Sequence, residues 1–480
     1  MAKLKNIIKQ LSDLDYETIY KSLVENGAEK SAYLLRAVRE KQTSDSKVME
    51  ELEVNSNAYY TLRSRLNQKI EEYLLQQMES PRTDLLKKVA NINEVVFTKK
   101  RAIAIATLTK LEKELLDYDL SNELTIVYKH LKKLHIHTGE HYSYSQLYNR
   151  HIAYMLAVDK AEDMLAEYFR KFGFYSLSGE ESDKMEVSLL HQELNNIAGM
   201  YQSHRLYVYQ ACMNIFHRLF VFDDSVNMES EAVEDMLEKC QRIFNNYNLD
   251  TTYYHLRLVF EYLRHEYYVH HRVYRKAEKY HEDINDELSS LLVNYNLFTY
   301  PALFLFSKID RALRLNLEAQ LYDENDDIFS EYENHEYDVP RYLMYMTYRA
   351  LSAHYKDKHD EAARWINTAL NNVSLKKYPY ASLELKTLLA FEYCLLKEQE
   401  LFSQVISSVQ RQLRLLGREQ CDHIAYFSKI MRVTMSGSRR DKEDKIGGWI
   451  PKIKYDKQHI IFTPTRFIRF DTKIVEKLCS

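Results

Sequence analysis

Residues 341–370 read RYLMYMTYRALSAHYKDKHDEAARWINTAL and predict two amphipathic helices joined by a short charged turn. Apolar residues recur at helical spacing in both halves: Leu343, Met346, Ala350 and Leu351, then Ala362, Ile366, Ala369 and Leu370. Asp360 and Glu361 open the second helix, where the helix dipole favours negative charge. One such hairpin cannot bury its apolar stripe alone, so we expect neighbouring hairpins to stack on it.

Glycine and proline are scarce, which favours an all-α fold. The 480 residues contain 9 Gly and 6 Pro, and none of the glycines lies between Gly199 and Gly417. Average usage would give about 34 and about 24. A β-rich chain needs glycine at the positive-φ positions of its turns, whereas a helical chain can end its helices on asparagine. We expect such left-handed ends at Asn246, Asn248, Asn294, Asn296, Asn371 and Asn372.

A repeat of helix pairs is indicated by three prolines. Pro301, Pro340 and Pro379 are spaced 39 residues apart, and each is expected to open a helix. A helix pair every 38–42 residues is typical of an α-solenoid. Asp360-Glu361-Ala362, followed by Ile366 and Ala369, resembles the second-helix pattern of the tetratricopeptide repeat. This resemblance, to a degenerate member with a longer period, implies a stack of helical hairpins with a concave binding face over about residues 100–435.

The N-terminal segment has a second pattern, a short helix from Ser44, a turn over 53–56 and a long helix from about Asn57. This order resembles the DNA-reading helix-turn-helix of bacterial sigma factors and LuxR-type regulators. The resemblance implies DNA contact through the outward residues Asn57, Tyr60, Arg63, Ser64 and Arg65. However, residues 1–80 hold 12 basic and 13 acidic residues, a poor balance for phosphate contacts. A three-helix cap for the solenoid explains the same pattern, and both interpretations stay open.

Tyrosine is used 39 times and clusters at helical spacing, as at Tyr342, Tyr345 and Tyr348. Amphipathic aromatic rings suit half-buried faces between helices, with the hydroxyl group at the rim. The alternative is that these three residues are rigid anchors for a partner peptide on the concave face.

The last part of the chain differs from the rest in its hydrophobic pattern and its charge. Gly437 to Lys457 breaks the helical pattern, and HIIFTPTRFIRFDTKIVEKL (459–478) alternates like a short β-ribbon around Pro464. Ser438 to Ser480 carries 11 basic and 6 acidic residues, so we expect a short basic arm that is either irregular or a β-ribbon. The predicted organisation is a helical domain over 1–80, a helical-repeat domain over 81–436 and this arm over 437–480.

Catalytic and metal-binding motifs are not evident. His265-Glu266 with His270 is one residue too long for a zinc-binding helix, and no phosphate-cradling glycine loop or nucleophile elbow occurs. The five cysteines are widely spaced and predict reduced thiols in a cytosolic protein. MAKLKNIIKQ lacks a signal-peptide core, and no 18-residue apolar run is present. We therefore expect a cytoplasmic, non-enzymatic protein without cofactor or metal.

Three functions follow in order of preference. The first is an adaptor or scaffold whose concave face binds a partner protein or peptide. The second is a transcription regulator in which residues 30–77 bind DNA and the repeats sense a partner, a plan that resembles bacterial regulators joining a helix-turn-helix to tetratricopeptide repeats. The third is a metal-dependent hydrolase of unrecognised type.

Overall fold

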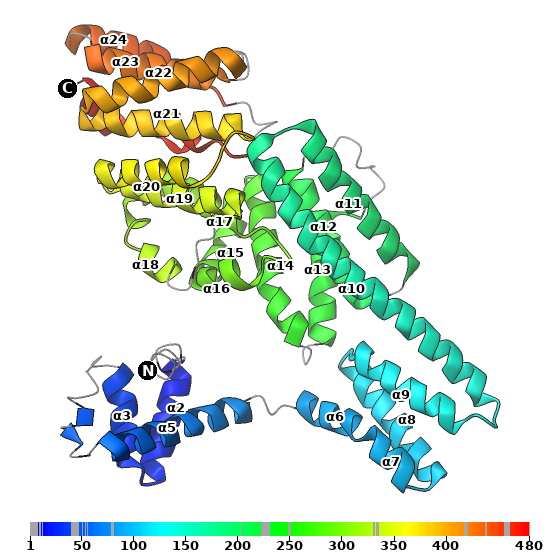
Figure 1. Ribbon diagram of the computed structural model, residues 1–480. Helices are drawn as coiled ribbons and strands as arrows, with labels where there is room; N and C mark the ends of the chain where they lie inside the picture. Colours follow the sequence, from blue (N-terminus) through cyan, green and yellow to red (C-terminus); the bar gives the residue numbers. More distant parts are fainter. Residues whose placement is uncertain are drawn as a thin grey trace. The chain divides into compact units, whose positions relative to one another are not determined.

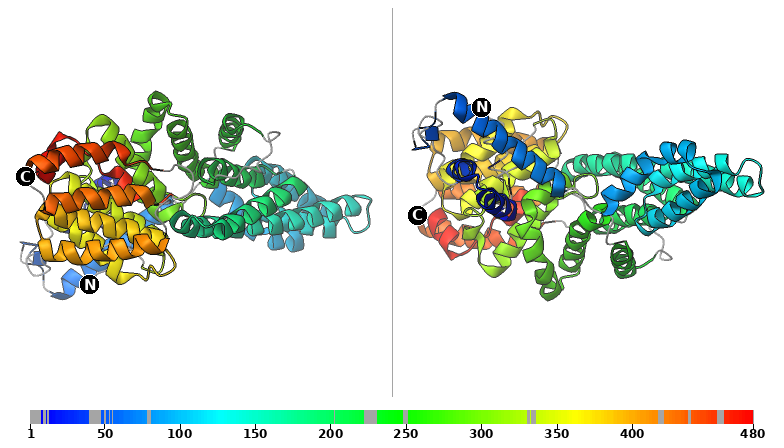
Figure 2. Two further views of the ribbon diagram at one scale, coloured as in Figure 1. Left: turned by 90° about the horizontal axis from the view of Figure 1, so that it is seen from above. Right: turned by 90° about the horizontal axis from the view of Figure 1, so that it is seen from below.

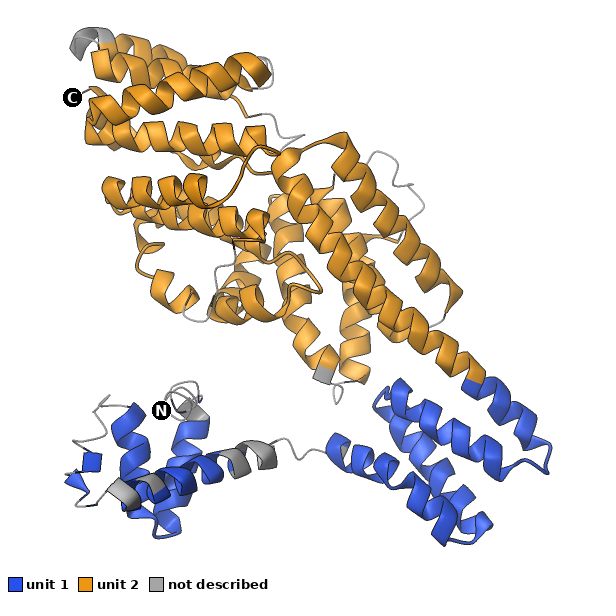
Figure 3. Cartoon of the chain, viewed as in Figure 1, with its two compact units in different colours: residues 1–148 blue, residues 149–480 orange. Residues whose placement is uncertain are grey.

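The computed structural model describes residues 8, 11, 13–39, 48–49, 51–52, 54, 56–77, 81–201, 203–221, 231–247, 251–329, 332, 336–416, 421–436, 439–455 and 461–479. Over these residues the chain is helical and contains no strand, which confirms the all-α prediction. None of the helices in these ranges is long and apolar enough to cross a bilayer. The chain divides into two compact units, 1–148 and 149–480 (Figure 3).

Unit 1 holds two separate hydrophobic cores, one built from residues 8–73 and the other from residues 85–148. The predicted boundary between residues 80 and 81 falls between these cores. Gly27, at φ 68°, lies just after the helix Asp13–Glu25. The helices are α2 Asp13–Glu25, α3 Glu29–Arg39, α5 Ser56–Gln77, α6 Pro81–Ala90, α7 Ile92–Thr98, α8 Arg101–Asp117, α9 Ser121–Leu134 and the first turns of α10 Glu140–Ser178.

Unit 2 is built around one continuous core that extends from α10 to the last helix. Its further helices are α11 Glu181–Met200, α12 His204–Phe220, α13 Val233–Asn246, α14 Thr251–His270, α15 Tyr274–Asp286, α16 Leu288–Asn294, α17 Ala302–Leu315, η1 Glu318–Gln320, α18 Asn325–Ile328, α19 Val339–Tyr355, α20 His359–Asn372, α21 Pro379–Leu396, α22 Gln399–Leu416, α23 Asp422–Ser436, α24 Arg439–Trp449, η3 Ile450–Lys452, η4 Pro464–Phe467 and α25 Thr472–Cys479.

The predicted hairpin over 341–370 is confirmed as α19 and α20. Its apolar positions are buried, except that Leu370 is half-buried. Pro301 precedes α17, Pro340 lies in the first turn of α19 and Pro379 opens α21, so each proline marks a helix start as predicted. The helices from α19 to α22 lie side by side in Figures 1 and 2. This packing of consecutive antiparallel helices is compatible with a helical-repeat solenoid.

The left-handed helix ends differ from the prediction. Among the described non-glycine residues, positive φ occurs at Asp119, Arg272, Asn316, Asp357 and Lys397, and at none of the asparagines predicted to hold it. Asn248 lies outside the described residues. Asparagine is only enriched in this conformation, and backbone hydrogen bonds can hold other residues there. At Asp357 the amide of the next residue, Lys358, donates to the carbonyl of Ala353 at 2.9 Å.

The predicted β-ribbon in the C-terminal arm is corrected by the structure. In the described part of this arm, residues 439–455 and 461–479, the chain forms α24, η3, η4 and α25. The side chains of Phe462, Phe467 and Ile468 are buried in the core of unit 2. The rings of Phe462 and Phe467 pack on Phe306 of α17, with centroids 6.0 and 5.2 Å away. This segment, which contains the short 3-10 helix η4, thus buries its apolar residues against helices without a partner strand.

Candidate functional site

An open surface site of unit 2 is a groove along α20, α21 and α22, which we call the α20–α22 groove. Its volume is about 730 Å³. Its walls mix apolar, amide and cationic side chains: Asn367, Leu370, Asn371, Leu375, Lys376, Pro379, Ser382, Lys386, Leu389, Gln404, Val405, Ser408, Arg411, Gln412, Leu415 and Leu416.

Helix periodicity explains why these residues share one groove. On α22 the lining positions fall at 404, 405, 408, 411, 412, 415 and 416, a repeating spacing of three and four residues that defines one helix face. The adjacent face of α22 carries Phe402, Ile406 and Val409, which are buried in the core. The amphipathic helix therefore presents a second surface with apolar character, on which the side chain of Leu415 is 81% exposed.

The charge of the groove is one-sided. Lys376, Lys386 and Arg411 line it, and none of the described residues in its lining is acidic. The Lys386 ammonium donates to Gln412 Oε1 at 3.2 Å, and Gln412 Nε2 donates to the carbonyl of Pro379 at 2.8 Å. Burial, and then the positive charge of Arg411, lower the pKa of Lys386. Within the described parts of the chain, no carboxylate pairs with any of these three cations.

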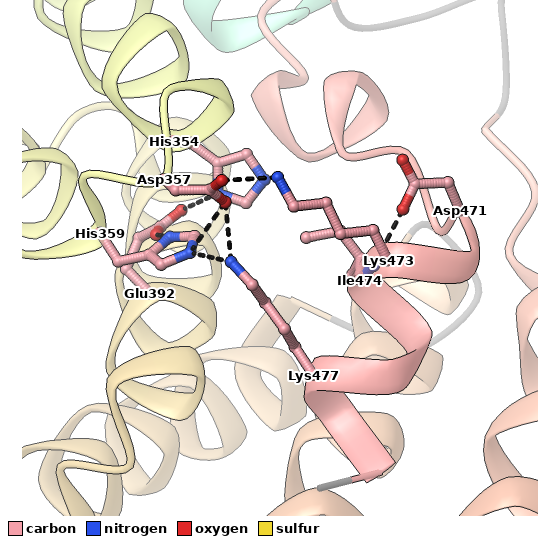
Figure 4. Close-up of polar contacts among 8 residues, drawn as sticks. All are labelled: His354, Asp357, His359, Glu392, Asp471, Lys473, Ile474 and Lys477. Atoms are coloured by element: carbon pink, nitrogen blue, oxygen red, sulfur yellow. Dashed lines mark hydrogen bonds and ion pairs between the residues drawn. The ribbon is translucent and has the colours of Figure 1, made fainter. Parts of the chain in front are cut away.

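A second candidate is a buried polar network that we call the Glu392 cluster (Figure 4). Glu392 of α21 receives hydrogen bonds from His354 Nδ1 at 2.7 Å and from His359 Nδ1 at 2.8 Å, one on each carboxylate oxygen. The other ring nitrogen of His359 lies 3.1 Å from the Lys477 ammonium of α25. Asp357 accepts from Lys473 at 2.5 Å and from Lys477 at 2.7 Å. The members are His354, Asp357, His359, Glu392, Lys473 and Lys477.

The protonation of this cluster follows from its donors and acceptors. A lysine ammonium only donates, so His359 Nε2 must accept and the proton of this ring is on Nδ1. A carboxylate only accepts, so His354 also carries its proton on Nδ1. Burial by itself would raise the pKa of Glu392, but charge interactions and hydrogen bonds with His354 and His359 outweigh it and lower the pKa.

The donor set of the Glu392 cluster also has the composition of a metal site. One ligand atom from each of His354, His359 and Glu392 lies within 4.8 Å of the others, and all three residues are buried. Two histidines and a carboxylate are common ligands of zinc or iron. However, each Nδ1 atom is already used in a hydrogen bond to Glu392, and the Lys477 ammonium repels a second cation. The arrangement therefore fits a clamp that joins α19, α20 and α21 to α25.

A second buried carboxylate of α21 also holds the C-terminal segment. Glu384 Oε2 accepts from the backbone amide of Thr465 at 3.1 Å and from its hydroxyl at 2.7 Å. Glu384 Oε1 is 2.5 Å from His423 Nε2. The Tyr355 hydroxyl donates to the carbonyl of Phe467. Residues 461–479 are thus fixed to the other helices of unit 2 by specific hydrogen bonds as well as by apolar packing.

The residues predicted to contact DNA lie along α5. Ser64 and Arg65 are exposed and Arg63 is half-buried. The side chains of Asn57 and Tyr60, and parts of the predicted turn, lie outside the described residues. Whether this helix contacts DNA stays a prediction.

The predicted partner-binding tyrosines lie in the core of unit 2. Tyr342 and Tyr348 are buried, and Tyr345 is half-buried against Phe329, Tyr332 and Trp365. These contacts favour packing between helices, the other interpretation of the pattern. They leave no large part of the rings of Tyr342 and Tyr348 on the surface.

Sequence reasoning missed both sites. The residues of the Glu392 cluster come together because α19, α20 and α21 pack side by side. The signal in the sequence was that Glu392 follows His354 by 38 residues, close to the 39-residue spacing of the prolines. The signal for the groove was the second apolar face of α22. The His265–Glu266 pair, by contrast, is a buried contact in which Glu266 also accepts from Ser307 at 2.9 Å.

Comparisons of this chain with protein-family models, with curated proteins and with solved structures found no match.

Proposed function

We propose that this protein is a non-enzymatic helical-repeat adaptor, similar in plan to tetratricopeptide-repeat proteins, that binds a segment of a partner protein. The observation that carries the proposal is the α20–α22 groove, an elongated surface with apolar walls and amide groups between stacked helices. Grooves of this composition bind peptides through apolar anchors, while a few polar groups fix the orientation of the peptide. We therefore propose the α20–α22 groove as the binding surface, in place of Tyr342, Tyr345 and Tyr348 of α19.

Peptide-phage selection on the full chain tests this function. We expect peptides that bind the wild-type protein and the Ser403→Trp variant, but bind Ser408→Trp at least about tenfold more weakly. Ser408 lines the groove, whereas Ser403 is exposed on α22 outside it, so the pair separates groove filling from a general effect of tryptophan. Failure to select any peptide, or selection of peptides indifferent to Ser408→Trp, would refute the proposal.

A second function, DNA binding by unit 1, is supported by one face of α5. Thr61, Ser64, Arg65, Gln68 and Lys69 are exposed at helical spacing, and none of them is acidic. If this face reads DNA, affinity for random duplex DNA should fall steeply with salt and should fall further in Arg65→Ala/Lys69→Ala. Lys87→Ala on α6 serves as the control. Absence of binding at low salt would remove this candidate.

A further inference from the structure

The length of the α20–α22 groove limits what it can hold. Its lining residues on α22 run from Gln404 to Leu416. Twelve steps of 1.5 Å give a wall about 18 Å long, which matches slightly more than three turns of an α-helix. A bound helix of about 12 residues would therefore fit along this wall.

The apolar surface in the groove indicates how such a segment would be anchored. Leu370, Val405 and Leu416 are half-buried, and Leu415 projects into solvent. Burying exposed apolar area against a partner is favourable by roughly 25 cal/mol per Å² before the costs of association. Apolar side chains at i, i+3 or i+4 and i+7 of an amphipathic helix have the spacing needed to cover these residues.

The charge of the groove selects among amphipathic helices. Lys386 uses one of its three ammonium hydrogens on Gln412, and Arg411 lies near enough to lower the pKa of Lys386. Two cations that repel each other in a partly desolvated site are stabilised when a carboxylate enters between them. A basic helix would add to the repulsion, because no acidic residue among the described lining residues could compensate it.

From these features we propose that the α20–α22 groove binds an acidic amphipathic helix of a partner protein, with its carboxylates on Lys386 and Arg411 and its apolar residues on Leu415 and Leu416. The inference rests on the proposed adaptor function and names the class of segment that the groove takes.

The test uses the full chain and two fluorescent 14-residue peptides. Both carry leucine at the same i, i+3, i+4 and i+7 positions, with glutamate elsewhere in one and lysine elsewhere in the other. We expect the acidic peptide to bind at least about tenfold more tightly by fluorescence anisotropy, and to weaken as salt is raised. Lys386→Glu/Arg411→Glu should reverse this preference. Arg414→Glu, an exposed residue of α22 outside the groove, should leave it unchanged.

Equal binding of the two peptides, or a charge-reversed variant that keeps the original preference, would overturn the assignment. Binding of a nucleic-acid oligomer in place of the peptide, lost in Arg411→Glu, would overturn it as well. The adaptor function can survive this failure: selection of neutral or basic peptides that Ser408→Trp blocks would retain the groove as a binding site and reject only the acidic class.

Discussion

Replacing Glu392 by glutamine keeps the size of the side chain and removes the negative charge at the centre of the Glu392 cluster. The carboxylate is 1% exposed and accepts one N–H from each of two imidazoles, at 2.7 and 2.8 Å. The glutamine carbonyl oxygen can accept from only one ring, and its NH2 group can only donate to the other. That second ring must then accept on Nδ1 and carry its proton on Nε2. His359 cannot do so without turning an N–H toward the Lys477 ammonium.

The expected loss follows from the change in hydrogen-bond type. A hydrogen bond to a charged group contributes about 1.5–3 kcal/mol, and a neutral one about 0.5–1.5 kcal/mol. Exchanging two charged bonds for two neutral ones therefore lowers the free energy of unfolding by about 2–3 kcal/mol. Both tryptophans, Trp365 and Trp449, lie in unit 2, so urea unfolding followed by tryptophan fluorescence reports on this unit alone.

The matched control is Arg364→Gln on α20. Arg364 pairs with Asp360 at 3.0 Å, but the two side chains are 74% and 69% exposed. Such a pair contributes less than about 0.5 kcal/mol. A loss in Glu392→Gln no larger than that of this control would show that the two imidazoles do not depend on a charged acceptor, and would refute the protonation scheme.

Three further predictions concern packing, pH and thiol accessibility. Gly173→Ala should destabilise unit 2 by about 1 kcal/mol in urea unfolding, because a Cβ atom would lie 3.1 Å from Tyr300 Oη and 3.3 Å from Pro340 Cβ; Gly199→Ala, with nothing within 4 Å, should instead stabilise its helix. Burial acts to raise the pKa of Asp357, but Lys473 and Lys477 outweigh it and lower the pKa from 3.8 to about 2. Because the folded-state pKa is depressed, the contribution of Asp357 is present above about pH 4 and is lost as the pH falls toward 2. Hydrogen exchange of α25, corrected for the intrinsic rate, should rise over this window in the wild type, and Asp357→Asn should show no such dependence. All five cysteines are free and buried, so a thiol reagent should modify them only on unfolding; rapid labelling of any of them in the folded protein would contradict the described core.

The sequence predicted the helices from α19 to α21 because their signals are local. Apolar residues at helical spacing and a proline at each helix start act within a single turn or two, and α19, α20 and α21 form where these signals place them. The scarcity of glycine likewise argued against a β-rich fold, because each tight turn needs a residue that tolerates positive φ.

The candidate sites could not be predicted because they depend on how helices stack. His354, His359 and Glu392 meet only when α21 packs on α19 and α20, and no residue near Glu392 in the sequence indicates the meeting. The alternation at Phe462, Pro464 and Phe467 was interpreted as a strand, because a segment lying across helices buries every second or third residue in the same way. The tyrosines of α19 could also be interpreted in two ways. Residues that anchor a partner on the surface and residues that pack in the core both recur at helical spacing.

The attachment of Thr465 to Glu384 has a consequence for biosynthesis. These partners are separated by 81 residues. At about 5–20 residues per second, a ribosome needs roughly 4–16 s to extend the chain from one to the other. During that interval the Glu384 carboxylate of α21 lacks two of its hydrogen-bond donors, the hydroxyl and the backbone amide of Thr465. The hydrogen bonds of Glu384 to Thr465 can therefore form only after residues 461–479 have been synthesised.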